Sequence, residues 1–255
     1  MGIALFQRSR RMMRFSALFG AVTFISACSG STVPEQGSDP IEGFNRAMHG
    51  FNKGVDTVVV RPLSKGYEFA VPATVKHVVN NEVRYVQLPI SFANSMLQGD
   101  VGRAGDTLAR IVVNTTIGGL GALDPATEMG IPEHSGDFGQ TLAVWGVGSG
   151  PYVELPLLGP TTVRDGLSRV GDYALNPLTY IGQGSTVAIA KAAETPVRIV
   201  DTRYRFGSLI DEVLYENDDS YSVVRNTFLQ RRKNAILNGN LAADDLPDIY
   251  EAEPF

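Results

Sequence analysis

Apolar residues recur at spacings of three and four along the first part of the chain, at Ile41, Phe44, Met48, Phe51, Val55 and Val58. This period predicts a helix with one apolar face. The opposite face is polar and carries Glu42, Asn45, Arg46, His49, Asn52, Lys53 and Asp56. Three glycines, Gly43, Gly50 and Gly54, lower helix propensity and suggest a bend or the close approach of another backbone. Periodicity alone favours a core helix over one at a membrane interface.

Further helices are indicated by their end signals. Pro72 opens one helical stretch, and Pro89 opens another that ends at Gly99, since proline in the first turn and glycine after the last mark helix limits. Asp100 is the expected cap of the next helix. Later helices are predicted from Thr161 or Thr162, near 186–206, and from about Ser220 to Leu237.

The middle of the chain has an unusual composition. Residues 111–163 contain no lysine or arginine and are rich in glycine and proline, so no long regular helix is expected there. The stretch "PYVELPLLGP" alternates enough to predict a small β-hairpin, with Tyr152 and Trp145 as candidate interface aromatics. After Cys28, no uninterrupted apolar run reaches the roughly 18 residues of a membrane-spanning helix.

The N-terminus has the layout of a secretory signal peptide: the basic segment "RSRRMMR", then an eleven-residue uncharged run, then small residues. Ile25, Ser26, Ala27 and Cys28 resemble a bacterial lipobox, in which the cysteine is lipidated and becomes the new N-terminus. The alternatives are an ordinary signal peptide that happens to contain a cysteine, and a buried thiol. The general secretory route is favoured over twin-arginine export, and Ser29 in place of aspartate points to the outer membrane.

Charge and composition narrow the function further. The signal segment holds four arginines and no acid, so a formal net charge of −5 becomes −9 after its removal. Such a chain is repelled by nucleic acid and by an anionic lipid surface, so charge alone makes neither an expected partner. With one cysteine and three dispersed histidines, no metal site or cofactor is expected. No phosphate-binding loop or nucleophile elbow occurs, and the adjacent Glu133, His134 and Ser135 do not make a catalytic triad.

Several long segments together resemble the MlaA/VacJ family of outer-membrane lipoproteins. They are "SDPIEGFNRAMHGFN", "VVRP", "FANSMLQGD", "RIVVNTTIGGLGALDPA", "EHSGDFGQTLAVWGVGSGPYVELPLLGPTTVRDGLSRVGD" and "NP". The resemblance spans about residues 38–240. It implies a mainly α, compact and ring-like body of amphipathic, interfacial helices with a small β-hairpin, lying in the periplasmic leaflet of the outer membrane around a central channel.

The resemblance also implies a function and partners. Mislocalised phospholipids would leave the outer leaflet through the channel and pass to a soluble periplasmic carrier of the MlaC type, which maintains lipid asymmetry, and family members associate with trimeric porins. Phe44, Met48 and Phe51 would meet acyl chains. Tyr152 and Glu154 are channel candidates, although Glu154 is equally interpretable as a solvent-facing hairpin acid.

The expected organisation is a lipoprotein signal peptide at 1–27, a lipidated flexible tether at 28–39, the helical domain at 40–240 and an acidic disordered tail at 241–255. The chain is expected not to be an enzyme, because a phospholipase would need a nucleophile and base that the motifs do not supply. A lipoprotein that merely braces the envelope, without transport, is the remaining alternative.

Overall fold

The fold is given by a computed structural model that describes residues 39–176, 179–180 and 185–237, with the backbone alone for 185–194. The expected signal peptide, the lipobox with Cys28, nearly all of the tether and the acidic tail lie outside these residues. The described part is mainly α-helical, with one two-stranded antiparallel sheet. The predicted fold class, mainly α with a small hairpin, is therefore confirmed.

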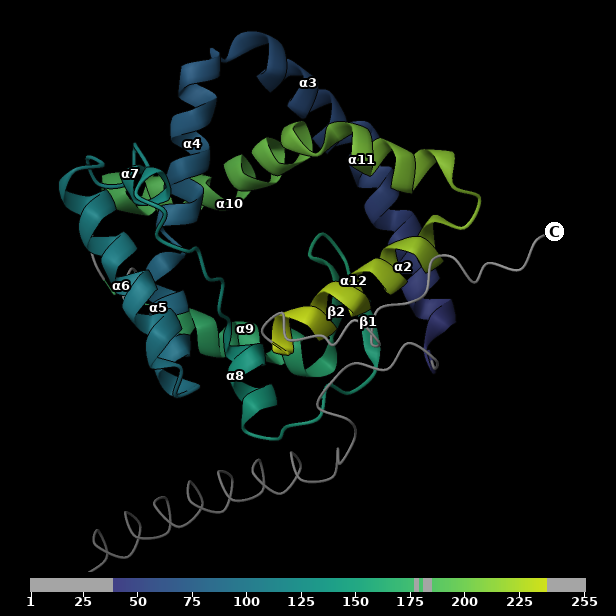
Figure 1. Cartoon of the computed structure of the whole chain (residues 1–255). Coiled ribbons are helices and arrows are strands. Elements are labelled where there is room, and N and C mark those ends of the chain that lie inside the picture. The colour runs from purple at the N-terminus through teal and green to yellow at the C-terminus, as the bar shows by residue number, and fades with distance from the viewer. Residues whose placement is uncertain (1–38, 177–178, 181–184, 238–255) are drawn as a thin grey trace, which may run out of the picture.

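The helices follow one another around a ring (Figure 1). Helices α3 and α4 form its upper arch, and α5 and α6 its left side. Helices α8, α9 and α12 and the hairpin lie below and to the right, and α10 runs beneath the arch, where it packs on α3 and α4. The helices are α2 (Glu42–Val55), η1 (Asp56–Val60), α3 (Arg61–Ala70), α4 (Ala73–Tyr85), α5 (Leu88–Leu97), α6 (Val101–Thr116), α7 (Pro125–Glu128), α8 (Phe138–Val144), α9 (Val163–Leu175), α10 (Ser185–Arg205), α11 (Gly207–Asp211), η3 (Glu212–Glu216) and α12 (Ser220–Ile236).

Side-chain caps fix several helix starts. The carboxylate of Asp100 accepts a hydrogen bond from the backbone of Arg103, which confirms the predicted cap of α6. The other side-chain caps open α7, α8, α9 and α12, and are Asp124, Asp137, Thr162 and Asp219. The predicted helices after Pro72, around Pro89 and near 186–206 and 220–237 are likewise present.

The chain remains helical beyond the predicted end of its first helix. After α2 it passes through one π-helical turn, η1, and continues without a break into α3, whose second residue is Pro62. Residues 117–162 contain only the short helices α7 and α8 and the hairpin, as expected. In the hairpin, β1 (Tyr152–Leu155) pairs with β2 (Gly159–Thr162), and Tyr152 lies opposite Thr162.

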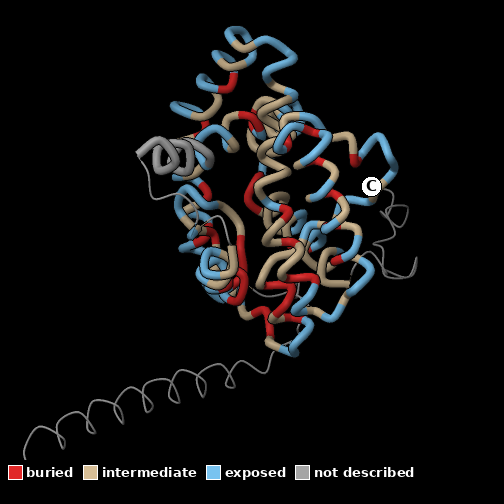
Figure 2. Tube along the Cα trace, turned by 90° about the vertical axis from the view of Figure 1, so that its left-hand side faces the viewer, coloured by how far each residue is buried: buried red, intermediate tan, exposed pale blue. Residues whose placement is uncertain are grey.

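The apolar core of the described residues is small. Tyr152, Tyr221 and Leu229 form one buried cluster, with Phe228 packed against it. Figure 2 shows buried residues gathered at the lower end of the molecule, where the hairpin, α8, α9 and α12 meet, while the upper arch is mostly exposed. Most of the remaining buried residues are polar or charged. Polar contacts must therefore hold much of this ring together.

Candidate functional site

Helix α2 turns its polar face inward and its apolar face outward. Asn45 has no exposed surface and His49 is 6% exposed, whereas Phe44 is 50% exposed and Phe51 48%. Met48, on the same apolar face, is half-buried. The interpretation of this face as part of a core is wrong for this structure, because the polar face makes the contacts with the rest of the ring. Phe44 and Phe51 are available to an apolar surrounding.

The same inversion recurs on other helices. Helix α6 buries Thr107, Arg110 and Asn114, and α9 buries Arg164, Asp165 and Ser168. Their outward positions are apolar, as shown by the exposed Leu108 and Val112 of α6 and Leu167, Val170 and Tyr173 of α9. Large exposed apolar surfaces mark sites of contact with another protein or with a membrane. We call the exposed apolar side chains of these helices and of the C-terminal end of α8 the outer belt, which comprises Phe44, Phe51, Leu108, Val112, Trp145, Leu167, Val170 and Tyr173.

Two asparagines of α2 cover the free edge of the hairpin. The side-chain amide of Asn45 donates to Tyr152 O at 3.2 Å and its oxygen accepts from Glu154 N at 2.9 Å. Two helical turns after Asn45, the side chain of Asn52 donates to Leu155 O at 3.0 Å and accepts from Leu157 N at 2.7 Å. Asn45 thus satisfies backbone groups of β1, and Asn52 satisfies backbone groups at the end of β1 and in the turn that follows it. The hairpin is thereby fixed to α2.

A carboxylate is buried in the same contact, where Glu154 is 2% exposed. His49 Nδ1 lies 3.2 Å from Glu154 Oε1, and His49 Nε2 lies 3.0 Å from the Ser220 hydroxyl of α12. The Tyr152 hydroxyl donates to Glu154 Oε2 at 3.2 Å. Burial, followed by the nearby Glu154 carboxylate, raises the pKa of Tyr152. We call Asn45, His49, Asn52, Tyr152, Glu154 and Ser220 the hairpin cluster, which joins α2, β1 and α12.

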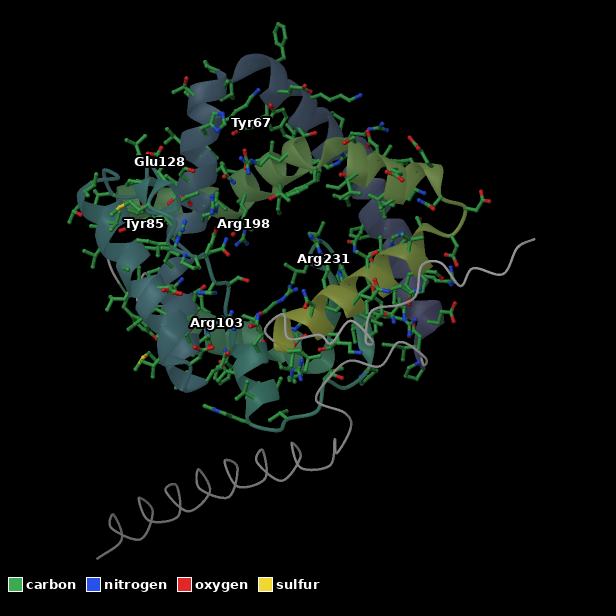
Figure 3. All side chains as sticks on the ribbon, viewed as in Figure 1. Tyr67, Tyr85, Arg103, Glu128, Arg198 and Arg231 are labelled. Atoms are coloured by element: carbon green, nitrogen blue, oxygen red, sulfur yellow. The ribbon has the colours of Figure 1, made fainter. Side chains whose placement is uncertain are left out.

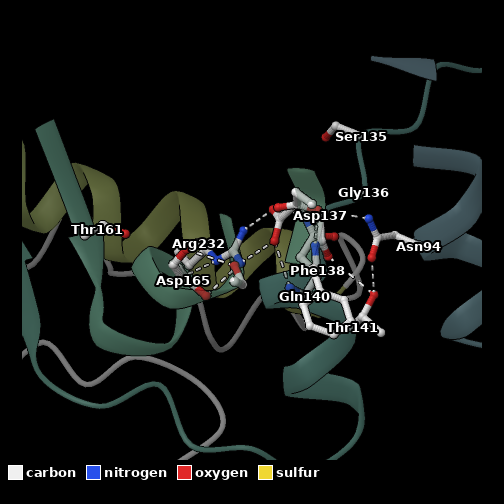
Figure 4. A network of polar contacts seen from close by, with 12 residues as sticks. Asn94, Ser135, Gly136, Asp137, Phe138, Gln140, Thr141, Thr161, Asp165 and Arg232 are labelled. Atoms are coloured by element: carbon white, nitrogen blue, oxygen red, sulfur yellow. Dashed lines mark hydrogen bonds and ion pairs between the residues drawn. The ribbon is translucent and has the colours of Figure 1, made fainter. Parts of the chain in front are cut away.

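A second cluster joins α8, α9 and α12 through Arg232, which reaches two carboxylates (Figure 4). Arg232 Nη1 donates to Asp137 Oδ2 at 2.5 Å and Nη2 to Asp165 Oδ1 at 2.9 Å. Burial opposes ionisation of Asp137, but the hydrogen bond and charge of Arg232 outweigh it and lower the pKa of Asp137. Arg164 also pairs with Asp165, at 2.9 Å.

Two further clusters hold the upper and left parts of the ring. Arg203 of α10 pairs with Asp56 at 2.9 Å and with Asp211 at 2.5 Å, so it links α10 to η1 and α11. Arg110 of α6 donates to Asp124 at 2.9 Å and to the carbonyl of Ile131 at 2.6 Å. A buried charge is costly unless it is paired. These ion pairs therefore make an arginine-containing interior compatible with folding.

The two predicted channel residues, Tyr152 and Glu154, lie together in the hairpin cluster. Tyr152 and Glu154 are both buried in the hairpin cluster, so the interpretation of Glu154 as a solvent-facing hairpin acid is wrong. Burial at this contact gives no support to a channel role for either residue, and that role stays a prediction. Cys28 and the lipobox residues Ile25, Ser26 and Ala27 lie outside the described residues.

The structure also shows the surroundings of Trp145, of His134 and of the glycines of α2. Trp145 is exposed, and its indole Nε1–H donates to Leu97 O at 3.1 Å. His134 pairs with Asp106 at 2.8 Å in a loop. A Cβ added at Gly43, Gly50 or Gly54 meets no described atom within 4 Å, so the predicted close approach of another backbone at these glycines is wrong.

Sequence reasoning noticed the polar face of α2 but not that it is the packing face. The available signal was repetition: polar or small side chains recur at helical spacing on three helices, as Asn45, His49 and Asn52, as Ser91 and Asn94, and as Thr107, Arg110 and Asn114. Small and polar residues that share one helix face favour close contacts between helices. Among the described residues, no helix combines the length and apolar character needed to cross a bilayer.

Comparison with known proteins agrees with this picture. A family model described as MlaA lipoprotein matches residues 37–235. The proteins named intermembrane phospholipid transport system lipoprotein MlaA of Escherichia coli (strain K12) and Shigella flexneri are each 32% identical to this chain over 246 residues, covering 92% of this chain and 94% of theirs. An uncharacterized protein of Rickettsia bellii is 34% identical over 203 residues, or 78% of this chain and 76% of its own.

A solved structure shares the fold. It is described as giving the structural basis for maintenance of bacterial outer membrane lipid asymmetry, and it matches with a TM-score of 0.69 and 30% identity over 78% of this chain and 99% of that chain. The match covers nearly all of that structure, and the family match spans almost the whole described ring. On this ground, the chain belongs to the MlaA lipoprotein family.

Proposed function

We propose that this chain is an outer-membrane lipoprotein that removes mislocalised phospholipids from the outer leaflet and so maintains lipid asymmetry. The observation that carries the proposal is the inverted polarity of the ring, in which buried polar clusters join helices whose exposed faces form the outer belt. A bilayer leaflet is the surrounding in which such a belt is stable. The names of the relatives support phospholipid transport as the activity.

The route of the lipid is part of the proposal. A phospholipid has a polar headgroup and apolar chains, so a path between leaflet and periplasm must offer both kinds of surface. We place this path through the middle of the helical ring (Figure 1). The lipid then passes to a soluble periplasmic carrier of the MlaC type. An association with a porin trimer would keep the ring at the outer membrane beside its substrate, and no catalytic step is required.

Acylation of Cys28 supplies the anchor. One acyl chain binds a membrane only marginally, at about 0.8 kcal/mol per buried methylene, so two or three chains hold the protein firmly. The outer belt then adds a second attachment over a wide surface. The ring is consequently expected on the periplasmic side of the outer membrane, with its belt in the inner leaflet of that membrane.

The experiment is chemical labelling of phosphatidylethanolamine at the surface of intact cells. Deleting the gene should raise labelling, the wild-type gene should restore it, and a Cys28→Ala form at equal abundance should fail to do so. The alternative of a lipoprotein that only braces the envelope predicts unchanged labelling in the deletion strain. That result would overturn the transport proposal.

A further inference from the structure

The middle of the ring carries positive side chains from three of its sides. Figure 3 shows Arg103 of α6, Arg198 of α10 and Arg231 of α12 around this space. The three residues are far apart in sequence, and the ring fold brings them to face a common centre. The guanidinium of Arg103 also donates to Ser135 O at 3.0 Å, in the loop that precedes α8.

Arg231 differs from its neighbours on the same helix. Arg232 is paired with Asp137 and Asp165, and Arg225 lies 3.7 Å from Asp39. Arg231 is exposed, and within the described part of the chain it has no ion pair or hydrogen bond. Helix α12 therefore uses Arg225 and Arg232 to hold the ring and presents Arg231 to its middle.

The chemistry of these side chains selects an anion. A guanidinium has five N–H donors in a planar fork, is always charged, and binds phosphate oxygens through paired hydrogen bonds. Such bonds are strengthened where low-dielectric walls enclose the site. A phosphodiester is the anionic group that glycerophospholipids with different headgroups share.

We propose that Arg103, Arg198 and Arg231 form a phosphate-binding site in the middle of the ring, with Arg231 as its principal contact. This inference rests on the proposed function and deepens it, because it names the part of the lipid that the protein recognises. The site holds the phosphodiester while the acyl chains follow apolar surface. Lipids with different headgroups are accepted, and a diacylglycerol without phosphate is not.

The test uses the full-length, lipidated protein in detergent and counts bound lipid by native mass spectrometry. The probes are phosphatidylglycerol and phosphatidylethanolamine, with a diacylglycerol of identical chains as the phosphate-free probe. Arg231→Gln should bind both phospholipids about tenfold more weakly, since a charged hydrogen bond of this kind contributes roughly that factor. Arg231→Lys should keep part of the affinity. Lys65→Gln is the matched control, because Lys65 of α3 is an exposed base without a contact among the described residues.

Three results would overturn the inference: equal binding of diacylglycerol, wild-type affinity in Arg231→Gln, or displacement of phosphatidylglycerol by millimolar inorganic phosphate, which would indicate a free-phosphate site. Circular dichroism should show unchanged helix content in Arg231→Gln, as expected for an exposed side chain. The labelling assay separates this inference from the proposed function. If the wild-type gene lowers surface phosphatidylethanolamine and Arg231→Gln lowers it equally, transport stands and the arginine site fails.

Discussion

Replacing Asn45 by leucine tests whether buried polar contacts, rather than an apolar core, hold the ring together. Asn45 is fully buried, and its amide satisfies both Tyr152 O and Glu154 N on the outer edge of β1. Leucine has the same branching as asparagine and fills its space, but it leaves these two backbone groups without that partner. Each buried group left unsatisfied costs about 1–3 kcal/mol, so Asn45→Leu should lower the free energy of unfolding by about 2–6 kcal/mol.

The assay is urea unfolding in detergent micelles, followed by circular dichroism and by the fluorescence of Trp145, the single tryptophan of the chain. Asn226→Leu is the control, since Asn226 lies on α12 with its side chain exposed, and exposed substitutions usually change stability by less than about 0.5 kcal/mol. If Asn45→Leu were as stable as the wild type, or more stable, the polar contact between α2 and β1 would not be a principal support of the ring.

Three other experiments test separate parts of the account. Arg232→Met should lower stability by about 1–3 kcal/mol, because it removes the charged hydrogen bonds to Asp137 and Asp165, although Asp165 keeps its pair with Arg164. The folded-state pKa of Asp137 is lowered, so the wild type should lose stability as pH falls below about 4, and Arg232→Met should lose that dependence in acid titrations. Val170 is 72% exposed and lies in the outer belt. The Val170→Asp protein should keep the wild-type helix content but bind vesicles more weakly in a flotation assay, because a charge deep in a bilayer costs about 2.5–3.5 kcal/mol. Unchanged flotation would count against a belt in lipid. Gly118→Ala places a Cβ 2.6 Å from Asn114 O and should lower the stability measured in thermal melts by about 1–3 kcal/mol. Gly50→Ala places its Cβ in open space and should leave the stability unchanged or raise it. The reverse order of stabilities would contradict the packing described.

Local signals in the sequence predicted much of the secondary structure. Asp100 caps α6 as expected, and "PYVELPLLGP" forms the predicted hairpin. The helix of residues 61–70 was not predicted, because it continues α2 through a π-helical turn that no local pattern marks. Such a turn depends on tertiary contacts, and here Asp56 is held by Arg203, 147 residues later in the chain.

The orientation of the helices could not be predicted from periodicity. A helix with one apolar and one polar face has the same pattern whether water or lipid surrounds it, so the pattern of α2 does not say which face packs inward. The contacts that determine which face packs inward join residues far apart in sequence, such as Asn45 with Tyr152 and His49 with Ser220. For the same reason Glu154 was interpretable in sequence as a solvent-facing acid, whereas its contacts with His49 and Asn52 of α2 bury it.

The central claim is that the outer belt of this ring contacts acyl chains. Trp145 is 54% exposed and is the only tryptophan, so its fluorescence reports its surroundings without further labelling. The protein is reconstituted into vesicles whose phospholipids carry bromine on the acyl chains, which quenches a tryptophan in contact with them. The account predicts strong quenching by brominated lipid and weak quenching by aqueous iodide. Strong quenching by iodide with none by brominated lipid would place Trp145 in water and contradict the account.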